Sequence, residues 1–395
     1  KIVDTFSSLT VSDYVIADGK SSILQDVSYY NKKNNNVISL SLPSIATTPD
    51  INSILNGKIK LSSLNLIRPV ASLSLSTIHL PGEEKGSKMP EVDIDKIIIL
   101  QPVINFNQHT EKGNLNINWD GSIEKDNRLE LTNILVNAGN FTDITVGKVL
   151  LNLNHFSYSE PKGKTFHTGD GEVATEISAI KWQQESGKKP AWRAKVDDFT
   201  ARNFHFDSLG KNHGILVINK TGLKGLSISS SSINNLQKLA GANSSFQLQQ
   251  FTGNYKDDKT EFRWFNAGFN QNSKIFTLDS FSFNPTLSRE SFLSKLTFQK
   301  DYINGGTGAI QIGPIDIDKY SKDMVLDIDC IKVDNPYLND YKDKSLPFAA
   351  GTIKPLPANM IKKIPFQISV DTIQLNNAKV DYTEVSEKTK MPGTI

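Results

Sequence analysis

The chain has 395 residues, of which 38% are hydrophobic and 22% charged, and its formal net charge at pH 7 is +2. The nearly balanced charge provides no basic field that would favour nucleic acid as a partner. A single cysteine, Cys330, excludes an internal disulfide and a cysteine-based zinc site, and no apolar stretch of about 18 residues predicts a membrane-spanning helix.

Alternation of apolar and polar residues with period two dominates the chain and predicts half-buried β-strands. Helical periodicity is scarce: the best candidate is residues 232–240, with a weaker one near 50–55. We therefore predict a mostly β fold with one or two short helices. The predicted architecture is an elongated, curved antiparallel sheet of repeated strand units, with an open groove and a filled sandwich core as the two alternatives for its apolar face.

We predict three regions in the chain. Residues 1–125 form an N-terminal β region, and residues 301–395 form a C-terminal one. The middle region, 126–300, is rich in aromatic residues and contains the helix predicted near 232–240. These aromatic residues indicate either a locally thicker core or a wider surface for lipid or a partner.

The alternation follows one recurring template. Two apolar residues two positions apart are followed by a two-residue step, a second apolar pair, and in most copies a Pro, Gly or Ala. The clearest copy is Val92, Ile94, Ile97, Ile99 and Pro102. Seven further copies begin, in chain order, at Ile59, Leu129, Leu151, Ala194, Phe276, Leu326 and Ile368. The template predicts one strand unit repeated with connections of variable length.

The two-residue step has a structural meaning. Residues two apart on a strand share a face, whereas Ile94 and Ile97 are three apart. One extra residue, a β-bulge at Asp95–Lys96, would return Ile97 to the apolar face; a tight turn is the alternative. Either interpretation predicts one apolar and one solvated face, and the Pro, Gly or Ala marks a bend or an interruption of pairing.

Two stretches of sequence resemble a known family. Residues 51–73 (INSILNGKIKLSSLNLIRPVASL) resemble the opening of AsmA-like proteins of the Gram-negative envelope. Residues 97–106 (IIILQPVINF), followed by Gly113-Asn-Leu-Asn116 and Trp119, are similar to the family's next strand, turn and aromatic residue. Ala378–Tyr382 with Gly393 also fits. The resemblance covers residues 50–120 and about the last 70, and the middle shares only the strand template.

The resemblance implies a non-enzymatic protein of the periplasm or cell envelope that binds or conducts lipid and contributes to outer-membrane assembly or maintenance. It implies anchoring in the inner membrane through an N-terminal segment outside this chain, with lipid or another apolar ligand as partner and no cofactor. The alternative is a structural or adhesion scaffold, built from filled β-sandwiches, that binds proteins or glycans. Protein partners are not predicted.

An apolar sheet face must pack against a second sheet, close on itself, or take up an apolar ligand. The residues expected to contact lipid come from the most apolar halves of the template. They are Leu64, Leu66, Ile97, Ile99, Phe281, Phe283, Ile373 and Leu375.

The sequence predicts neither a catalytic nor a metal site. The histidines form no ligand pair, and His155 and His205 are expected to face solvent. The aspartates between Asp316 and Asp334 alternate with apolar residues, which favours the solvated face of strands over a calcium site. Neither a phosphate-binding loop nor a Gly-x-Ser-x-Gly sequence is present.

Overall fold

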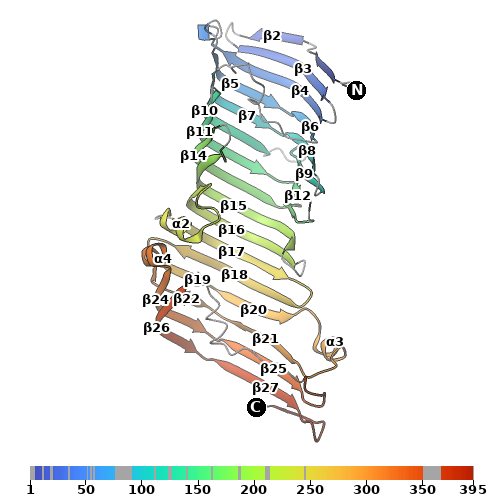
Figure 1. Cartoon of the computed structure of the whole chain (residues 1–395), viewed down its shortest axis with the longest axis vertical. Helices are drawn as coiled ribbons and strands as arrows, with labels where there is room; N and C mark the ends of the chain where they lie inside the picture. Colours follow the sequence, from blue (N-terminus) through green and yellow to red (C-terminus); the bar gives the residue numbers. More distant parts are fainter. Residues whose placement is uncertain are drawn as a thin grey trace. The chain divides into compact units, whose positions relative to one another are not determined.

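The computed structural model describes residues 5–10, 13–17, 21–33, 36–50, 52–53, 56, 58–75, 91–110, 113–122, 127–138, 141–161, 163–185, 188–209, 214–243, 246–349 and 366–394. Strands make up most of this part of the chain, as predicted. Two compact units are present, and each is described by itself (Figure 1). Unit 1 contains residues 1–208 and 222–235, and unit 2 contains residues 209–221 and 236–395.

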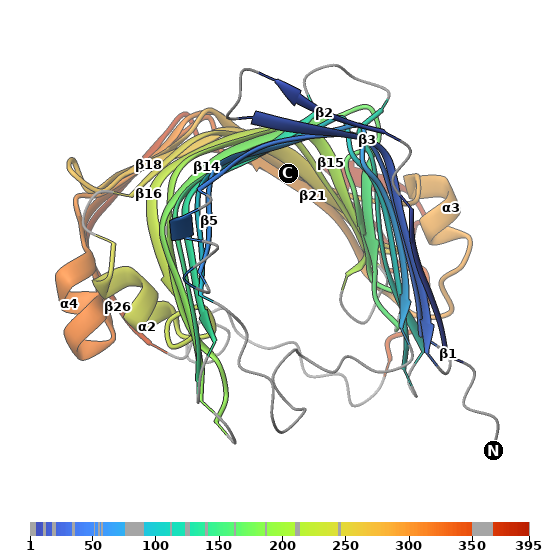
Figure 2. The same ribbon diagram turned by 90° about the horizontal axis from the view of Figure 1, so that it is seen from above.

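Unit 1 is a sheet of strands arranged side by side. The strands are β1 Thr5–Thr10, β2 Asp13–Ala17, β3 Ser21–Lys33, β4 Asn36–Pro49, β5 Ile59–Ile67, β6 Val70–Leu75, β7 Val92–Leu100, β8 Val103–Thr110, β9 Gly113–Asp120, β10 Arg128–Ala138, β11 Phe141–Leu153, β12 Phe156–Ser159, β13 Thr165–His167, β14 Glu172–Glu185 and β15 Ala191–Leu209. β16, Gly214–Ser229, is divided between the units. Figure 2 shows that β14 and β15 bend along their length.

The strands between β4 and β15 form two columns, by which we mean two series of strands, each paired side by side with the next. β4 is long enough to pair with both β5 and β6, and β15 pairs with both β14 and β13. One column runs β5, β7, β10, β11, β14, and the other runs β6, β8, β9, β12, β13. Through β4 and β15 the pairings close into a ring of twelve strands.

This ring corrects one part of the prediction. Within the described residues the predicted open groove is not confirmed, because β5 and β6 both pair along β4, and β13 and β14 both pair along β15, which links the two columns into one twelve-strand ring of pairings. A filled sandwich is not seen either, since the described strands of each unit belong to one sheet without a second sheet stacked on it. The prediction of antiparallel pairing needs a smaller correction, because β5–β7 and β6–β8 are parallel.

At the template step, each of two neighbouring strands has one residue that has no partner on the other strand. These residues lie side by side across the sheet. Between β7 and β10, Lys96 lies opposite Thr132 and Ile94 opposite Ile134, so Asp95 and Asn133 are skipped together. The next strands skip Gly147 and Ala179 at the same level. Asn133 and Ala179 have φ values of 53° and 52°. Each of these four strands therefore gains the extra residue that the bulge interpretation predicts, and the register among β7, β10, β11 and β14 does not shift, whereas the register between β14 and β15 does.

The columns meet where one strand ends and the next begins in line with it. β5 and β6 are separated by Arg68, with φ of 52°, and Pro69; β7 and β8 are separated by Gln101, with φ of 50°, and Pro102. A left-handed residue turns the chain sharply, and the proline cannot donate to the ladder. The residue that closes the template thus marks a strand bend, as predicted.

A buried polar side chain fills this junction. Asn127 is almost fully buried, and its Oδ1 accepts hydrogen bonds from Trp119 Nε1 at 3.2 Å and from the Asn154 amide at 2.9 Å. Its Nδ2 donates to Asn154 Oδ1 at 2.6 Å, and its carbonyl accepts from the amide of Gln101 at 2.9 Å. Asn127 therefore satisfies polar groups that the interrupted ladder leaves without strand partners.

In unit 2, as in unit 1, a long strand pairs with two shorter strands that lie in line. Its strands are β17 Gln247–Lys256, β18 Thr260–Asn270, β19 Ile275–Leu278, β20 Ser280–Pro285, β21 Asp301–Thr307, β22 Ile310–Ile312, β23 Ile315–Asp316, β24 Val325–Asp334, β25 Tyr337–Asp343, β26 Gln367–Asn376, β27 Lys379–Val385 and β28 Pro392–Thr394. β18 pairs with β19 and β20, which follow each other in line. β24 pairs with β26, and β25 with β27, in parallel.

Three short helices occur in the described part of the chain, which is more than the one or two predicted. α2, Leu236–Gly241, begins four residues after the start of the predicted helix at 232–240. α3, Arg289–Leu293, and α4, Ile317–Asp323, are not predicted. The candidate near 50–55 lies largely outside the described residues. Within those residues, none of the helices combines the length and apolar character needed to cross a membrane.

Candidate functional site

The apolar residues of the template line up across unit 1. Ile97 lies opposite Leu64 of β5 and opposite Leu131 of β10. Ile99 lies between Leu66 and Leu129 in the same way. We call the resulting surface the apolar face of unit 1. It contains Leu61, Leu64, Leu66, Ile94, Ile97, Ile99, Leu129, Leu131, Ile134, Val146, Val149 and Leu151.

Only the centre of this face is buried. Ile94, Ile134 and Val146 form a cluster in which Ile94 is 8% exposed. The surrounding aliphatic side chains, such as Ile97 and Leu131, pack against this cluster but stay half-buried. Side chains on one face of a sheet shield each other sideways, and full burial needs a second layer or a ligand.

The opposite face is charged and paired. On the strands of the same column, Lys96 Nζ lies 2.8 Å from Glu130 Oε1, and Lys148 Nζ lies 2.6 Å from Glu176 Oε1. Arg128 also contacts Glu130. Alternation along each strand places these residues on the face away from Ile97 and Ile99. The predicted division into two faces is thus seen in this column as an apolar and a charged face, although Glu130 on the charged face is buried, at 6% exposed.

The structure separates the eight residues predicted to contact lipid into two groups. Leu64, Leu66, Ile97 and Ile99 are neighbours on the apolar face of unit 1, and all four are half-buried. Phe281, Phe283, Ile373 and Leu375 belong to unit 2. Because the two units are described separately, the eight residues do not constitute one observed site.

The two pairs in unit 2 occupy different strands and differ in exposure. Phe281 and Phe283 are half-buried on β20, and both contact the ring of Phe262 on β18, at 6.2 and 6.5 Å between ring centroids. Ile373 and Leu375 lie on β26 opposite Ile331 and Val333 of β24. These two side chains are 63% and 57% exposed.

A polar cluster lies at the ends of β21, β25 and β27 in unit 2. Lys342 Nζ is 3.4 Å from Asp301 Oδ1, and these side chains are only 17% and 15% exposed. Tyr382 donates its hydroxyl proton to Glu384 Oε2 at 2.8 Å, and Lys344 Nζ lies 2.7 Å from the same oxygen. Burial, together with the adjacent Glu384 carboxylate, raises the pKa of Tyr382 to about 12. The Lys344 ammonium, followed by Tyr382, lowers the pKa of Glu384.

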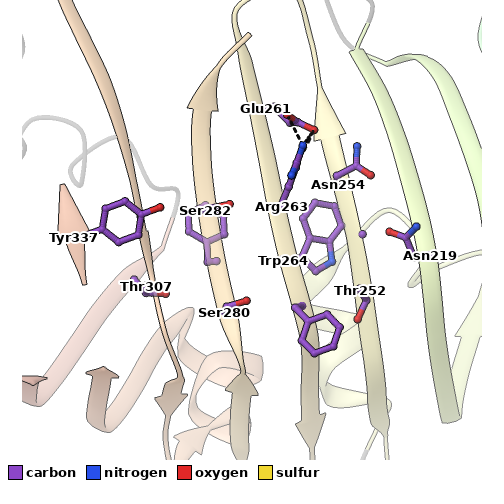
Figure 3. Close-up of a pocket in the computed structure, with 13 residues that line it drawn as sticks. Asn219, Thr252, Asn254, Glu261, Arg263, Trp264, Ser280, Ser282, Thr307 and Tyr337 are labelled. Carbon is purple, nitrogen blue, oxygen red and sulfur yellow. Dashed lines mark hydrogen bonds and ion pairs between the residues drawn. The ribbon is translucent and has the colours of Figure 1, made fainter. Parts of the chain in front are cut away.

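A shallow hollow of about 650 Å³ lies on strands of unit 2 (Figure 3). Thr252 of β17 and Ser280 of β20 line it beside an ion pair on β18. In this pair Arg263 donates from Nε to Glu261 Oε1 at 3.0 Å and from Nη2 to Oε2 at 3.1 Å. Phe265, on the same strand, is 55% exposed. The hollow therefore combines hydroxyl groups, a fixed charge pair and an exposed aromatic ring.

Sequence reasoning missed a pair of histidines. His167 of β13 and His205 of β15 lie opposite each other with stacked rings, 4.9 Å between centroids. His167 Nε2 is also 3.3 Å from Asp207 Oδ2. His205 was expected to face solvent, but it is half-buried against His167. The two residues are distant in sequence, so only the strand register brings them together.

The aspartates considered as calcium ligands have other partners. Asp316 accepts from the amide of Lys319 at the start of α4, and Asp327 pairs with the Lys319 ammonium. Asp334 accepts from Asn376 Nδ2 at 2.7 Å. Among the described residues, no group of three or more His, Cys, Asp or Glu side chains is arranged to hold a metal ion.

A comparison of the chain with protein-family models, curated proteins and solved structures finds no match.

Proposed function

We propose that the apolar face of unit 1 binds the acyl chains of a lipid, and that the protein is a non-enzymatic component of the cell envelope. The proposal includes a periplasmic location, an inner-membrane anchor outside this chain and a contribution to outer-membrane assembly or maintenance. These parts depend on the resemblance to AsmA-like proteins. The lipid-binding part depends on the molecule itself.

The observation that carries the proposal is the row of half-buried aliphatic side chains around Ile94. Ile97 and Leu131 pack sideways against the central cluster, and the described strands provide no second sheet above them. A contiguous apolar surface of this kind on a protein indicates an interaction site. Aliphatic side chains in register across strands suit a ligand that is long, flexible and lacks polar groups along its length.

The free energy available from such contacts is sufficient for binding. Removing a methylene group from water contributes about 0.8 kcal/mol. About ten methylene groups, each half desolvated on the sheet, would give roughly 4 kcal/mol by the same measure, before the cost of immobilising the ligand. The charged face, with its Lys96–Glu130 and Lys148–Glu176 pairs, offers no comparable surface.

Mass spectrometry of organic extracts from the natively purified protein tests whether lipid is bound. A fluorescent fatty acid then measures affinity for the wild-type chain and for Ile97→Gln. We expect the substitution to weaken binding about tenfold, because it places an amide in contact with an alkyl chain. Extracts without lipid, together with no fluorescent response, would refute the proposal.

The chain offers a matched control at the adjacent position. Ile98 is also half-buried, but it lies on the charged face opposite Glu130. Ile98→Gln changes the same side chain on the same strand and should leave fatty-acid binding within about twofold of wild type. Equal losses in both variants would indicate damage to the strand instead of a lost contact.

The hollow of unit 2 favours a second candidate function, the binding of a glycan. Serine and threonine hydroxyls, the Arg263–Glu261 pair and the exposed ring of Phe265 can contact the polar and apolar faces of a sugar. A glycan array with wild type and Phe265→Ala tests this function. Binding that disappears in the variant supports it, and absence of binding to any glycan rejects it.

A further inference from the structure

A second hollow, of about 630 Å³, lies on unit 2 next to the hollow shown in Figure 3. Both are lined by β17 and β18, and the consecutive residues Phe265 and Asn266 line the first and the second hollow. The Asn266 amide donates to Thr252 Oγ1 of the first hollow at 2.9 Å. The two hollows are therefore contiguous, and we call them together the double hollow. Along β18 it extends from Glu261 to Asn270.

The double hollow lies on the polar face of β18. Trp264 contacts the ring of Phe251 on the apolar face, at 5.2 Å between ring centroids. Phe265 follows Trp264 in the strand, so its side chain lies on the other face. Asn266 has a φ of 54° and is the extra residue of a template step. Gly268 therefore returns to the same polar face as Phe265.

A row of residues in register forms the first hollow. From β17 to β25 the row consists of Asn254, Arg263, Ser282, Gly306 and Tyr337. Figure 3 shows Tyr337 and Asn254 on opposite sides of Arg263. A Cβ atom at Gly306 would lie 2.9 Å from Tyr337 Cε1, so the glycine lets this ring lie against the sheet. Tyr337 and Phe265 are 39% and 55% exposed, and they give the hollow two accessible aromatic rings.

The second hollow is uncharged and is lined by amide groups. Gly268 lies opposite Thr277, and Thr277 lies opposite Gln311 of β22. A Cβ atom at Gly268 would lie 3.3 Å from Thr277 Oγ1, so the glycine leaves the space beside this hydroxyl open. Gln249 of β17 and Gln311 are exposed on the two sides of this space. Each glutamine amide can both donate and accept hydrogen bonds.

The lining groups identify one class of ligand. Among the described residues that line either hollow, only Glu261 and Arg263 are charged, and they pair with each other. An anionic ligand would therefore find no free cation in this lining, and an alkyl chain would leave the amides without partners. Sugar hydroxyls match the amide and hydroxyl groups, and the negative face of an aromatic ring attracts the C–H groups of a sugar.

We propose that the double hollow binds one linear, uncharged polysaccharide, whose chain runs along β18 and contacts both hollows. The distance from Glu261 to Asn270 along the strand is about 30 Å, which is long enough for several sugar rings. Phe265 and Tyr337 stack on rings at one end, and Gln249 and Gln311 bind hydroxyls at the other. This inference rests on the glycan binding proposed for the first hollow and is independent of lipid binding.

The probes are two series of neutral, extended oligosaccharides, cello-oligosaccharides and chito-oligosaccharides, each of two to six rings. Isothermal titration calorimetry with the full chain measures their affinity. In at least one series, we expect the six-ring oligomer to bind at least tenfold more tightly than the two-ring oligomer, because only the longer chain reaches the second hollow. An oligogalacturonate of six rings, which is anionic, should bind more weakly than the neutral oligomer.

Variants separate the two hollows. Phe265→Ala should weaken the binding of every oligomer. Gln311→Ala should weaken the six-ring oligomer at least fivefold and leave the two-ring oligomer unchanged. The matched control is Gln367→Ala, because Gln367 is an exposed glutamine on β26 outside the double hollow. This variant and Ile97→Gln should both bind like wild type.

Several results would overturn the inference. They are equal affinity for short and long oligomers, normal binding of the six-ring oligomer by Gln311→Ala, and tighter binding of the anionic oligomer. Each of these leaves glycan binding at the first hollow intact if Phe265→Ala still weakens it. Absence of binding in both series also overturns the inference, and a glycan array that is negative as well rejects the function on which it rests.

Discussion

The aligned step residues predict a specific coupling between Gly147 and Asn133. A Cβ atom added at Gly147 would lie 2.9 Å from Asn133 Cβ and Nδ2, and 3.2 Å from the carbonyl oxygen of Thr132. Carbon atoms in contact are normally about 3.5–4.0 Å apart. Gly147→Ala should therefore destabilise unit 1 by about 1–3 kcal/mol, the usual cost of overpacking.

Asn133→Gly should relieve most of this cost. It removes the Cβ and the amide that the new methyl group meets, and leaves only the Thr132 carbonyl close to it. Alone, it should be nearly neutral. Glycine adopts the left-handed backbone without the strain of about 1–2 kcal/mol that another residue has there, which stabilises the folded state. The greater flexibility of glycine in the unfolded chain opposes this gain by about 0.5–1 kcal/mol. In the double variant, Gly147→Ala should cost at most about 1 kcal/mol, a coupling of roughly 1–2 kcal/mol.

Urea unfolding of the full chain measures the cycle by tryptophan fluorescence, which reports mainly on unit 1 because Trp119, Trp182 and Trp192 lie there and Trp264 lies in unit 2. Additivity of the two substitutions within about 0.5 kcal/mol would show that the residues do not share one level of the sheet. The skipped residues would then be a property of single strands, and the alignment described above would be refuted.

Three further predictions concern a buried asparagine and two half-buried polar groups. Asn127→Ala leaves the Trp119 indole and the Asn154 amide without their acceptor and should lower the free energy of unfolding by about 2–3 kcal/mol in the same urea assay, whereas a loss below about 0.5 kcal/mol would contradict this role. Tyr382 should keep its proton until about pH 12, against an ordinary pKa of 10. Unit 2 should thus have full stability below pH 10 and lose stability as the pH rises from 10 to about 12, and Tyr382→Phe should reduce that loss; absorbance at 295 nm follows the ionisation, and a tyrosine set titrating wholly near pH 10 would disprove it. Because Lys344 and Tyr382 lower the pKa of Glu384, its stabilising effect should be present above the ordinary value of 4.5 and disappear as the pH falls below it, so Glu384→Gln should flatten the acid side of the stability curve.

The sequence predicts individual strands far better than their arrangement. Ile94 and Ile97 identify the step because local spacing alone shows it. The pairing of Ile97 with both Leu64 and Leu131 depends on register between distant segments, and the sequence contains no direct signal for it. The same reason explains why the His167–His205 contact was missed and why the closed ring could not be inferred.

The prediction missed the short helices α3 and α4 for a different reason. α3 and α4 are too short for periodicity, and their only signals are the capping residues Ser288 and Asp316, whose side chains accept from Ser291 and Lys319 amides. In the candidate site, the apolar character of Leu64, Leu66, Ile97 and Ile99 was predictable. The exposure of Ile373 and Leu375 could not be predicted, because it depends on which strand lies next to β26.

The template has a symmetry with consequences for how such a sheet can grow. Its spacing of two, three and two residues reads the same from either end. A strand such as β7 can therefore match a parallel neighbour, β5, and an antiparallel neighbour, β10, with the same residues in contact. Insertion or duplication of one strand, in either direction, would preserve the apolar face and the line of unpaired residues. A sheet of this type can change length during evolution without a new sequence pattern.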